Sequence, residues 1–276
     1  MIWSGAFDAS IPLEAVKKAG ADGIEIPVFD PVAFDVPGFR KALAAHDLAC
    51  TVCSVNPPGK NPISDDPAAR AAAADHWNRV IHLTAEVGAD RLVGPTYSPV
   101  GYLPGRRRTP EEWKRGVEFH QRLIAPLEQA GVHLAVEPLN RFETHFLNTA
   151  DDAVQFVEKV GGSHVGILFD TFHANIEEKN VAAACRACGK WLKHVHTCEN
   201  DRGVPGSGHV DWSGLFSALK DLGYDGWLTI ESFNAGIPEI AAATAIWRDL
   251  APASGDIAFQ GTAFLKQAWS SMGGRT

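Results

Sequence analysis

The sequence predicts a (β/α)8 barrel, a closed ring of parallel strands in which each strand is followed by a helix. Strand-like and helix-like segments alternate along the whole chain. The 276 residues contain no break in composition, which suits one large α/β domain. We therefore expect residues 1–276 to form a single domain, with an extra helix at the C-terminal end. A doubly wound sheet is the alternative fold.

The strands are predicted from short apolar runs rich in β-branched residues and bounded by turn residues. The run from Val165 to Asp170, for example, is apolar until its last residue, as in a strand buried on both faces. The expected strands are Ile2–Phe7, Gly23–Val28, Ala49–Val55, Arg91–Gly94, Val132–Leu139, Val165–Asp170, Lys193–Glu199 and Trp227–Phe233.

The helices are predicted from their start and stop signals. Thr109, Pro110 and Glu112 form a typical helix start, with a threonine cap, proline at the first position and glutamate at the third. Asp66 is the expected cap of another helix, and Gly131 ends the one that Thr109 begins. The expected helices are Ile11–Ala19, Gly38–His46, Pro67–Val87, Thr109–Ala130, Thr149–Val160, Val181–Leu192, Asp211–Leu222 and Pro238–Leu250, with Ile257–Ser271 as the extra one.

The composition excludes several classes of protein. Apolar residues make up 45% and charged residues 21% of the chain, as in an ordinary globular protein with a sizeable core. The formal net charge of −8 argues against a nucleic acid or an anionic membrane as the main partner. We find neither a secretory signal nor an apolar run that approaches the roughly 20 residues of a membrane span, and therefore expect a cytoplasmic protein.

Two short motifs have structural rather than functional interpretations. The pairs Cys50/Cys53 and Cys185/Cys188 have zinc-site or redox spacing, but the first lies in a predicted strand and the second in a predicted helix. We expect buried, reduced thiols. The basic run 106–108 is expected to be a solvated loop, with a substrate phosphate or a neighbouring subunit as the alternative contact.

Four consecutive predicted strands end in ionisable residues. They are Glu137, Asp170, His196 and Glu231, spaced about one βα unit apart. The strand ends of a barrel meet at one rim, so these side chains converge. Three converging carboxylates repel one another, and a divalent cation removes that cost. Three oxygen ligands and one nitrogen favour Mn²⁺, with Mg²⁺ or Co²⁺ as alternatives. Taken singly, each residue has an alternative role as a helix cap or rim ion pair.

Four segments resemble the sugar isomerase/epimerase superfamily of xylose isomerase-like TIM barrels. They are EPLNRFETHFLN, GILFDTFHANIEE, HVHTCENDRGVPGSGHVDW and GYDGWLTIESF. Within the superfamily they are most similar to the D-tagatose/D-allulose (psicose) 3-epimerases. The match is close from Glu137 to Leu250 and general before that.

The resemblance implies a role for each site residue. Glu137, Asp170, His196 and Glu231 would bind the metal, and the two glutamates would also exchange protons with the substrate. Glu143 would hold a terminal hydroxyl group, and His173 and Arg202 would contact the ketone oxygen. The implied reaction inverts C3 of a free ketose through an enediolate. Relatives form homodimers or homotetramers, and we expect the same here.

Other functions stay open at this point. A related isomerase or dehydratase of a keto-sugar or polyol, of the hydroxypyruvate isomerase or inosose dehydratase type, is the main alternative. Apurinic endonucleases share the barrel, but the acidity of this chain argues against them. A non-catalytic sugar or metal sensor is the third class, and the intact set of acidic ligands argues against it.

Overall fold

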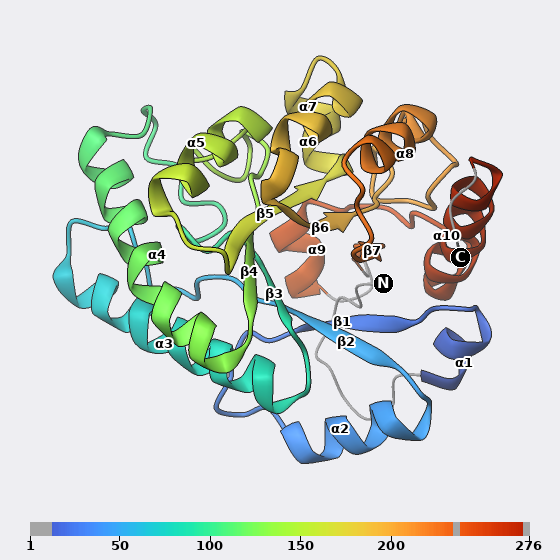
Figure 1. The fold of residues 1–276 in the computed structure, drawn as a ribbon, viewed down its shortest axis with the longest axis horizontal. Coiled ribbons are helices and arrows are strands. Elements are labelled where there is room, and N and C mark those ends of the chain that lie inside the picture. The colour runs from blue at the N-terminus through green and yellow to red at the C-terminus, as the bar shows by residue number, and fades with distance from the viewer. Residues whose placement is uncertain (1–12, 234–237, 273–276) are drawn as a thin grey trace.

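The computed structural model describes residues 13–233 and 238–272, and these residues form a nearly closed parallel barrel with alternating helices (Figure 1). Each strand pairs with the next one along the chain, in the order β1-β2-β3-β4-β5-β6-β7. A doubly wound sheet reverses its strand order part-way, so this order confirms the barrel. The strands are β1 (Gly23–Pro27), β2 (Ala49–Cys53), β3 (Arg91–Gly94), β4 (His133–Val136), β5 (Val165–Asp170), β6 (Leu192–His196) and β7 (Leu228–Thr229). The predicted strand Ile2–Phe7 lies outside the described residues.

Helices surround the strands (Figure 1). They are α1 (Leu13–Lys18), α2 (Val36–Ala45), α3 (Pro67–Glu86), α4 (Pro110–Ala130), α5 (Ala150–Val160), α6 (Thr171–Glu177), α7 (Val181–Cys188), α8 (Trp212–Asp221), α9 (Pro238–Thr244) and α10 (Ser254–Ser271), with a 3-10 turn η1 (Gly189–Trp191). The capping box predicted at Thr109 and Glu112 is present, and Gly131 ends α4 in the left-handed conformation. The extra C-terminal helix is α10.

Two predicted helix boundaries are wrong, and one short helix was not predicted. Val181–Leu192 is not one helix, because Gly189 takes a positive φ of 52° after α7 and Leu192 already belongs to β6. The helix predicted to reach Leu250 ends at Thr244, and the left-handed residue Ala245 follows it. The short helix α6 was not predicted, although its cap, Asp170, was considered as one.

The strands are packed on both faces, as their apolar sequences predicted. All six residues of β5 are buried. Gly166 in this strand has no room for a side chain, because a Cβ atom there would clash with the backbone oxygen of Trp191 and the side chain of Lys193. The tight contact between β5 and its neighbour brings their C-terminal ends to the same rim.

The cysteines are buried and unpaired in the described part of the chain, as predicted. Cys50 joins the main core, whereas Cys53 packs with Val93, Ala135 and Leu168 in a separate cluster, one residue from each of four adjacent strands. The two thiols therefore point to opposite faces of β2. No described helix combines the length and the apolar character that a membrane crossing requires.

The basic run 106–108 lies in a loop in which Arg106 and Arg107 are exposed, as predicted, and two of its arginines also form ion pairs. Arg106 forms a bidentate ion pair with Glu112, in which Nη1 and Nη2 each donate to one carboxylate oxygen at 2.9 Å. Arg108 donates to Asp152 at 2.8 Å and lies 4.6 Å from the ring centroid of Trp113. These contacts attach the loop before α4 to α4 itself and to α5.

Candidate metal centre and active site

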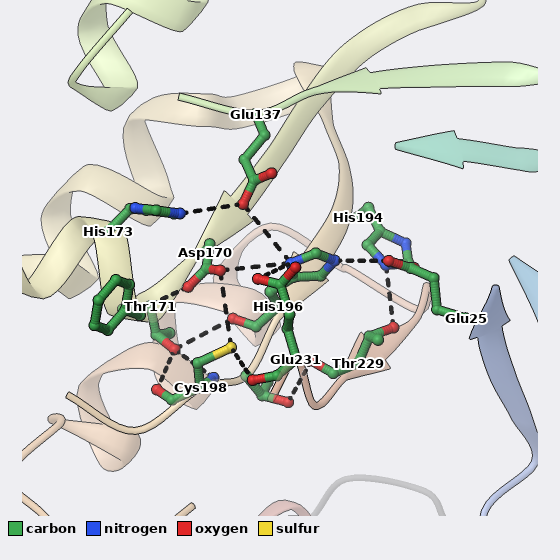
Figure 2. A network of polar contacts seen from close by, with 12 residues as sticks. Glu25, Glu137, Asp170, Thr171, His173, His194, His196, Cys198, Thr229 and Glu231 are labelled. Atoms are coloured by element: carbon green, nitrogen blue, oxygen red, sulfur yellow. Dashed lines mark hydrogen bonds and ion pairs between the residues drawn. The ribbon is translucent and has the colours of Figure 1, made fainter. Parts of the chain in front are cut away.

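Four ionisable side chains meet at the C-terminal ends of β4 to β7 (Figure 2). Asp170 and His196 are the last residues of β5 and β6, whereas Glu137 and Glu231 follow β4 and β7. All four are buried, and one ligand atom of each lies within 4.8 Å of the others. The structure thus brings together every residue that the sequence indicated as a metal ligand.

The donor atoms surround a space that suits a cation. His196 Nδ1 lies 3.4 Å from Glu231 Oε2, 3.5 Å from Asp170 Oδ2 and 3.8 Å from Glu137 Oε1. Both His196 Nδ1 and Glu137 Oε1 are buried, and neither has a hydrogen-bond partner in the described part of the chain. Buried polar atoms are normally paired, so two unpaired atoms that face one point indicate a missing ligand. Three carboxylates and an imidazole fit a divalent cation.

Charge is unevenly distributed among these groups. Burial raises the pKa of Glu137 well above its usual value, and the neighbouring Glu231 carboxylate adds to the effect. Burial also acts to raise the pKa of Asp170, but the Arg202 guanidinium together with His196 and His173 outweighs it and holds that pKa well below normal. Without a cation, Glu137 therefore carries a proton while Asp170 is ionised.

Arg202 supplies positive charge next to the carboxylates. Its Nη1 lies 2.6 Å from Asp170 Oδ2 and 2.8 Å from Glu231 Oε2. The guanidinium also covers the ring of Phe172, 4.2 Å from its centroid. Arg202 takes a left-handed backbone conformation with φ of 67°. This conformation is uncommon for residues other than glycine, so other contacts must hold the loop in place.

Glu199 holds the shape of this loop. Its carboxylate accepts hydrogen bonds from the backbone of Gly206 at 2.8 Å and Val210 at 3.0 Å, and from the indole of Trp212 at 3.1 Å. These bonds join the two ends of the segment that carries Arg202. Glu199 was predicted only as the end of a strand, and its function in the loop follows from the structure.

His173 and Glu143 lie beside the centre and share one partner. Asn140 donates its backbone N–H to His173 Nδ1 at 3.1 Å and its side-chain amide to Glu143 Oε1 at 2.8 Å. Burial lowers the pKa of His173 to about 3, so the ring is neutral. Because Nδ1 accepts a hydrogen bond, the proton of His173 is on Nε2, which lies 3.6 Å from Glu137 Oε1. Arg141, two residues before Glu143, pairs with Glu177 instead and leaves Glu143 to Asn140.

Sequence reasoning missed Glu25 and His194. Both are completely buried inside the barrel, and Glu25 contacts His194 and His196 (Figure 2). A signal was present for each residue. Glu25 interrupts the apolar strand GIEIPV, and His194 precedes His196 by two positions and thus shares its face of the strand.

Comparison with known proteins agrees with the fold. The family model described as Xylose isomerase-like TIM barrel matches residues 13–256. The chain belongs to this family. The resemblance recognised in the sequence is thereby confirmed.

Several relatives match this xylose isomerase-like barrel over nearly its full length. A probable ketose 3-epimerase of Synechocystis sp. is 33% identical, over 98% of this chain and 95% of the relative. The ketose 3-epimerase of Arthrobacter globiformis is 32% identical, over 96% and 93%. A crystal structure of D-allulose 3-epimerase from Methylomonas sp. in complex with D-allulose superimposes with a TM-score of 0.91, at 31% identity, and covers 96% of this chain and 94% of that one.

Proposed function

We propose that this chain is a divalent-metal-dependent epimerase that inverts C3 of a free ketose, either a ketohexose or a ketopentose. One observation carries the proposal: Glu137 and Glu231 reach the same four-residue cluster from the ends of two strands that are not neighbours, β4 and β7. The names of the relatives that match nearly the whole chain support the same reaction.

The cation would be held by Glu137, Asp170, His196 and Glu231. Mn²⁺ is the first candidate, with Mg²⁺ or Co²⁺ as alternatives, because the ligand set is rich in oxygen. When bound there, the cation supplies positive charge that stabilises the negative charge developing at the ketone oxygen.

The two glutamates would act as a base and an acid. Glu231 forms an ion pair with Arg202 at 2.8 Å, and its carboxylate is suited to remove the proton from C3. Glu137 reaches the cluster from the end of β4, and in this scheme it enters the reaction protonated and returns its proton to C3. If the two carboxyl groups act on opposite faces of the sugar, the configuration at C3 inverts. In the reverse direction the two groups exchange roles.

The remaining site residues would bind the sugar. Arg202 and the Nε2–H of His173 are donors suited to the oxygen on which charge develops, and such donors act best when fixed in advance. The bond from Asn140 to His173 provides that fixation. Glu143, which Asn140 orients, would accept a hydrogen bond from a terminal hydroxyl group.

Deuterium incorporation tests the reaction directly. The Mn²⁺-loaded enzyme is incubated in D₂O with fructose, tagatose and ribulose, and products are identified by NMR. We expect deuterium at C3 together with the C3 epimer of at least one of these sugars. Glu137→Gln and Glu231→Gln should each lower turnover by about 100- to 10,000-fold, since each removes one proton-transfer group.

Glu177→Gln is the control, because this carboxylate pairs with Arg141 outside the cluster and its loss should leave turnover nearly unchanged. Formation of an aldose with exchange at C1 would indicate an isomerase, and loss of water a dehydratase. Near-normal turnover in both glutamine variants of the cluster would refute the two-carboxylate mechanism.

The remaining expectations accompany this proposal. We expect one domain spanning residues 1–276, a cytoplasmic location, and a homodimer or homotetramer. Light scattering coupled to size-exclusion chromatography measures the last of these.

A further inference from the structure

The His196 ring lies between the single carboxylate of Glu25 on one edge and the three rim carboxylates on the other (Figure 2). Nδ1 faces Glu137, Asp170 and Glu231, and has no hydrogen-bond partner. Nε2, on the other edge of the ring, lies 3.0 Å from Glu25 Oε1. The two ring nitrogens therefore have different tasks, and the contact at Nε2 determines what Nδ1 can do.

Glu25 is a buried carboxylate surrounded by several hydrogen-bonding groups of other strands. It belongs to β1, which is not a sheet neighbour of β6, so its side chain reaches His196 through the barrel interior. Its Oε2 accepts from Thr51 Oγ1 at 2.6 Å and lies 2.8 Å from His194 Nε2. The two oxygens of Glu25 thus face a hydroxyl and two ring nitrogens, all of which can donate, and this is the surrounding of an ionised carboxylate that accepts at each position.

An ionised carboxylate only accepts hydrogen bonds, so the atom that faces it must be a donor. His196 therefore keeps a proton on Nε2. A cation can bind at Nδ1 only when this nitrogen is unprotonated, and the ring then keeps its single proton on Nε2 and a lone pair on Nδ1. That lone pair points at the three carboxylates of the rim, where it has no hydrogen-bond partner among the residues that the structure describes.

From this geometry we propose that Glu25 is a positioning residue for the cation site. It holds His196 Nε2–H, fixes the ring plane, and so presents the Nδ1 lone pair to the cation. The inference rests on the proposed function, because it concerns a ligand of the proposed cation. Outer carboxylates that orient a metal-binding histidine typically contribute 10- to 100-fold to metal affinity.

A second cation between Glu25, His194 and His196 is the competing interpretation, since their ligand atoms also lie close together. The facing atoms are already within 2.8 Å and 3.0 Å of each other, as direct hydrogen bonds require. Thr51 occupies a further position on the same carboxylate. The nitrogens of His194 and His196 that face Glu25 are thus engaged with it, and the unpaired atom of His194 is its other nitrogen, Nδ1, whereas on the rim side the facing atoms His196 Nδ1 and Glu137 Oε1 are themselves unpaired among the described residues.

Glu25→Gln tests the inference. The amide has the same shape but places an N–H₂ group toward one of the two imidazoles, so the carboxylate no longer selects the Nε2–H form of His196. We expect the Kd for Mn²⁺, measured by calorimetry or electron paramagnetic resonance, to rise about 10- to 100-fold. Thr51→Val is the matched control, since it removes a donor from the other oxygen of Glu25, and its Kd should stay within about threefold of wild type.

A second measurement reads the protonation of His196 directly. In ¹⁵N-labelled wild-type protein saturated with diamagnetic Mg²⁺, His196 should show a protonated Nε2 and an unprotonated Nδ1, with His196→Asn used for assignment. The opposite tautomer overturns the inference, and this result does not depend on whether Glu25→Gln folds. A folded Glu25→Gln variant with the wild-type Kd overturns it as well. Absence of saturable Mn²⁺ binding by the wild type would instead contradict the proposed function itself.

Discussion

Arg202→Met is the sharpest test of the charge balance in the cation-free site. Arg202 is 5% exposed, and its guanidinium contacts Asp170 and Glu231 at 2.6 and 2.8 Å. Methionine has a similar length but no charge. Both residues carry a Cβ atom, so the strain of the left-handed backbone at this position is the same in each.

The magnitude follows from burial. Removing one partner of a buried ion pair leaves an uncompensated charge and costs about 3–5 kcal/mol. For a chain of this size, 1 kcal/mol corresponds to roughly 2–4 °C in Tm. Without a cation we therefore expect Tm to fall by on the order of 10 °C. Mn²⁺ replaces the missing positive charge, so it should raise the Tm of the variant more than that of the wild type.

Differential scanning calorimetry gives the Tm of the wild type and of Arg202→Met, each measured once with EDTA and once with excess Mn²⁺. Arg141→Met is the control, because the Arg141 side chain is 62% exposed and its pair with Glu177 is worth about 1 kcal/mol or less. An Mn²⁺-induced rise in Tm that is no larger in Arg202→Met than in the wild type would refute the argument that Arg202 balances the charges of the metal ligands.

Two further predictions concern stability. Burial lowers the pKa of His120 from 6.5 to about 4, so below pH 6.5 the unfolded chain binds a proton that the folded chain does not accept. The free energy of unfolding should therefore fall by about 3 kcal/mol between pH 6.5 and 4 on account of this residue, and urea titrations of His120→Gln should show a correspondingly weaker pH dependence. Gly94 ends β3 with φ of 132°, and a Cβ atom there would clash with the backbone oxygen of Ser54. In urea titrations, Gly94→Ala should lower the free energy of unfolding by more than about 3 kcal/mol. Gly101 also has a positive φ but has open space around it, so Gly101→Ala should lower the same quantity by only about 1 kcal/mol. Equal losses in the two variants would contradict the packing argument.

Much of the fold and of the rim was readable from the sequence because the signals are local. Apolar runs located the strands within a few residues, and a barrel places their ends together, so Glu137, Asp170, His196 and Glu231 were predicted as one cluster. Boundaries were less certain where packing decides them. The stretch from Val181 to Leu192 has a helical pattern throughout, yet its last residue pairs in the sheet.

Only the tertiary structure showed what lies behind the rim. Glu25 and His196 are separated by 171 positions, and no local pattern relates a glutamate in the first described strand to a histidine in the sixth. Their contact depends on closing the sheet, because closure is what brings β1 and β6 to a common interior. The positions of Arg202 and His173 depend similarly on loops held by Glu199 and Asn140. The identities of the ligands are thus encoded along the chain, whereas their protonation and orientation are set by groups that only folding makes neighbours.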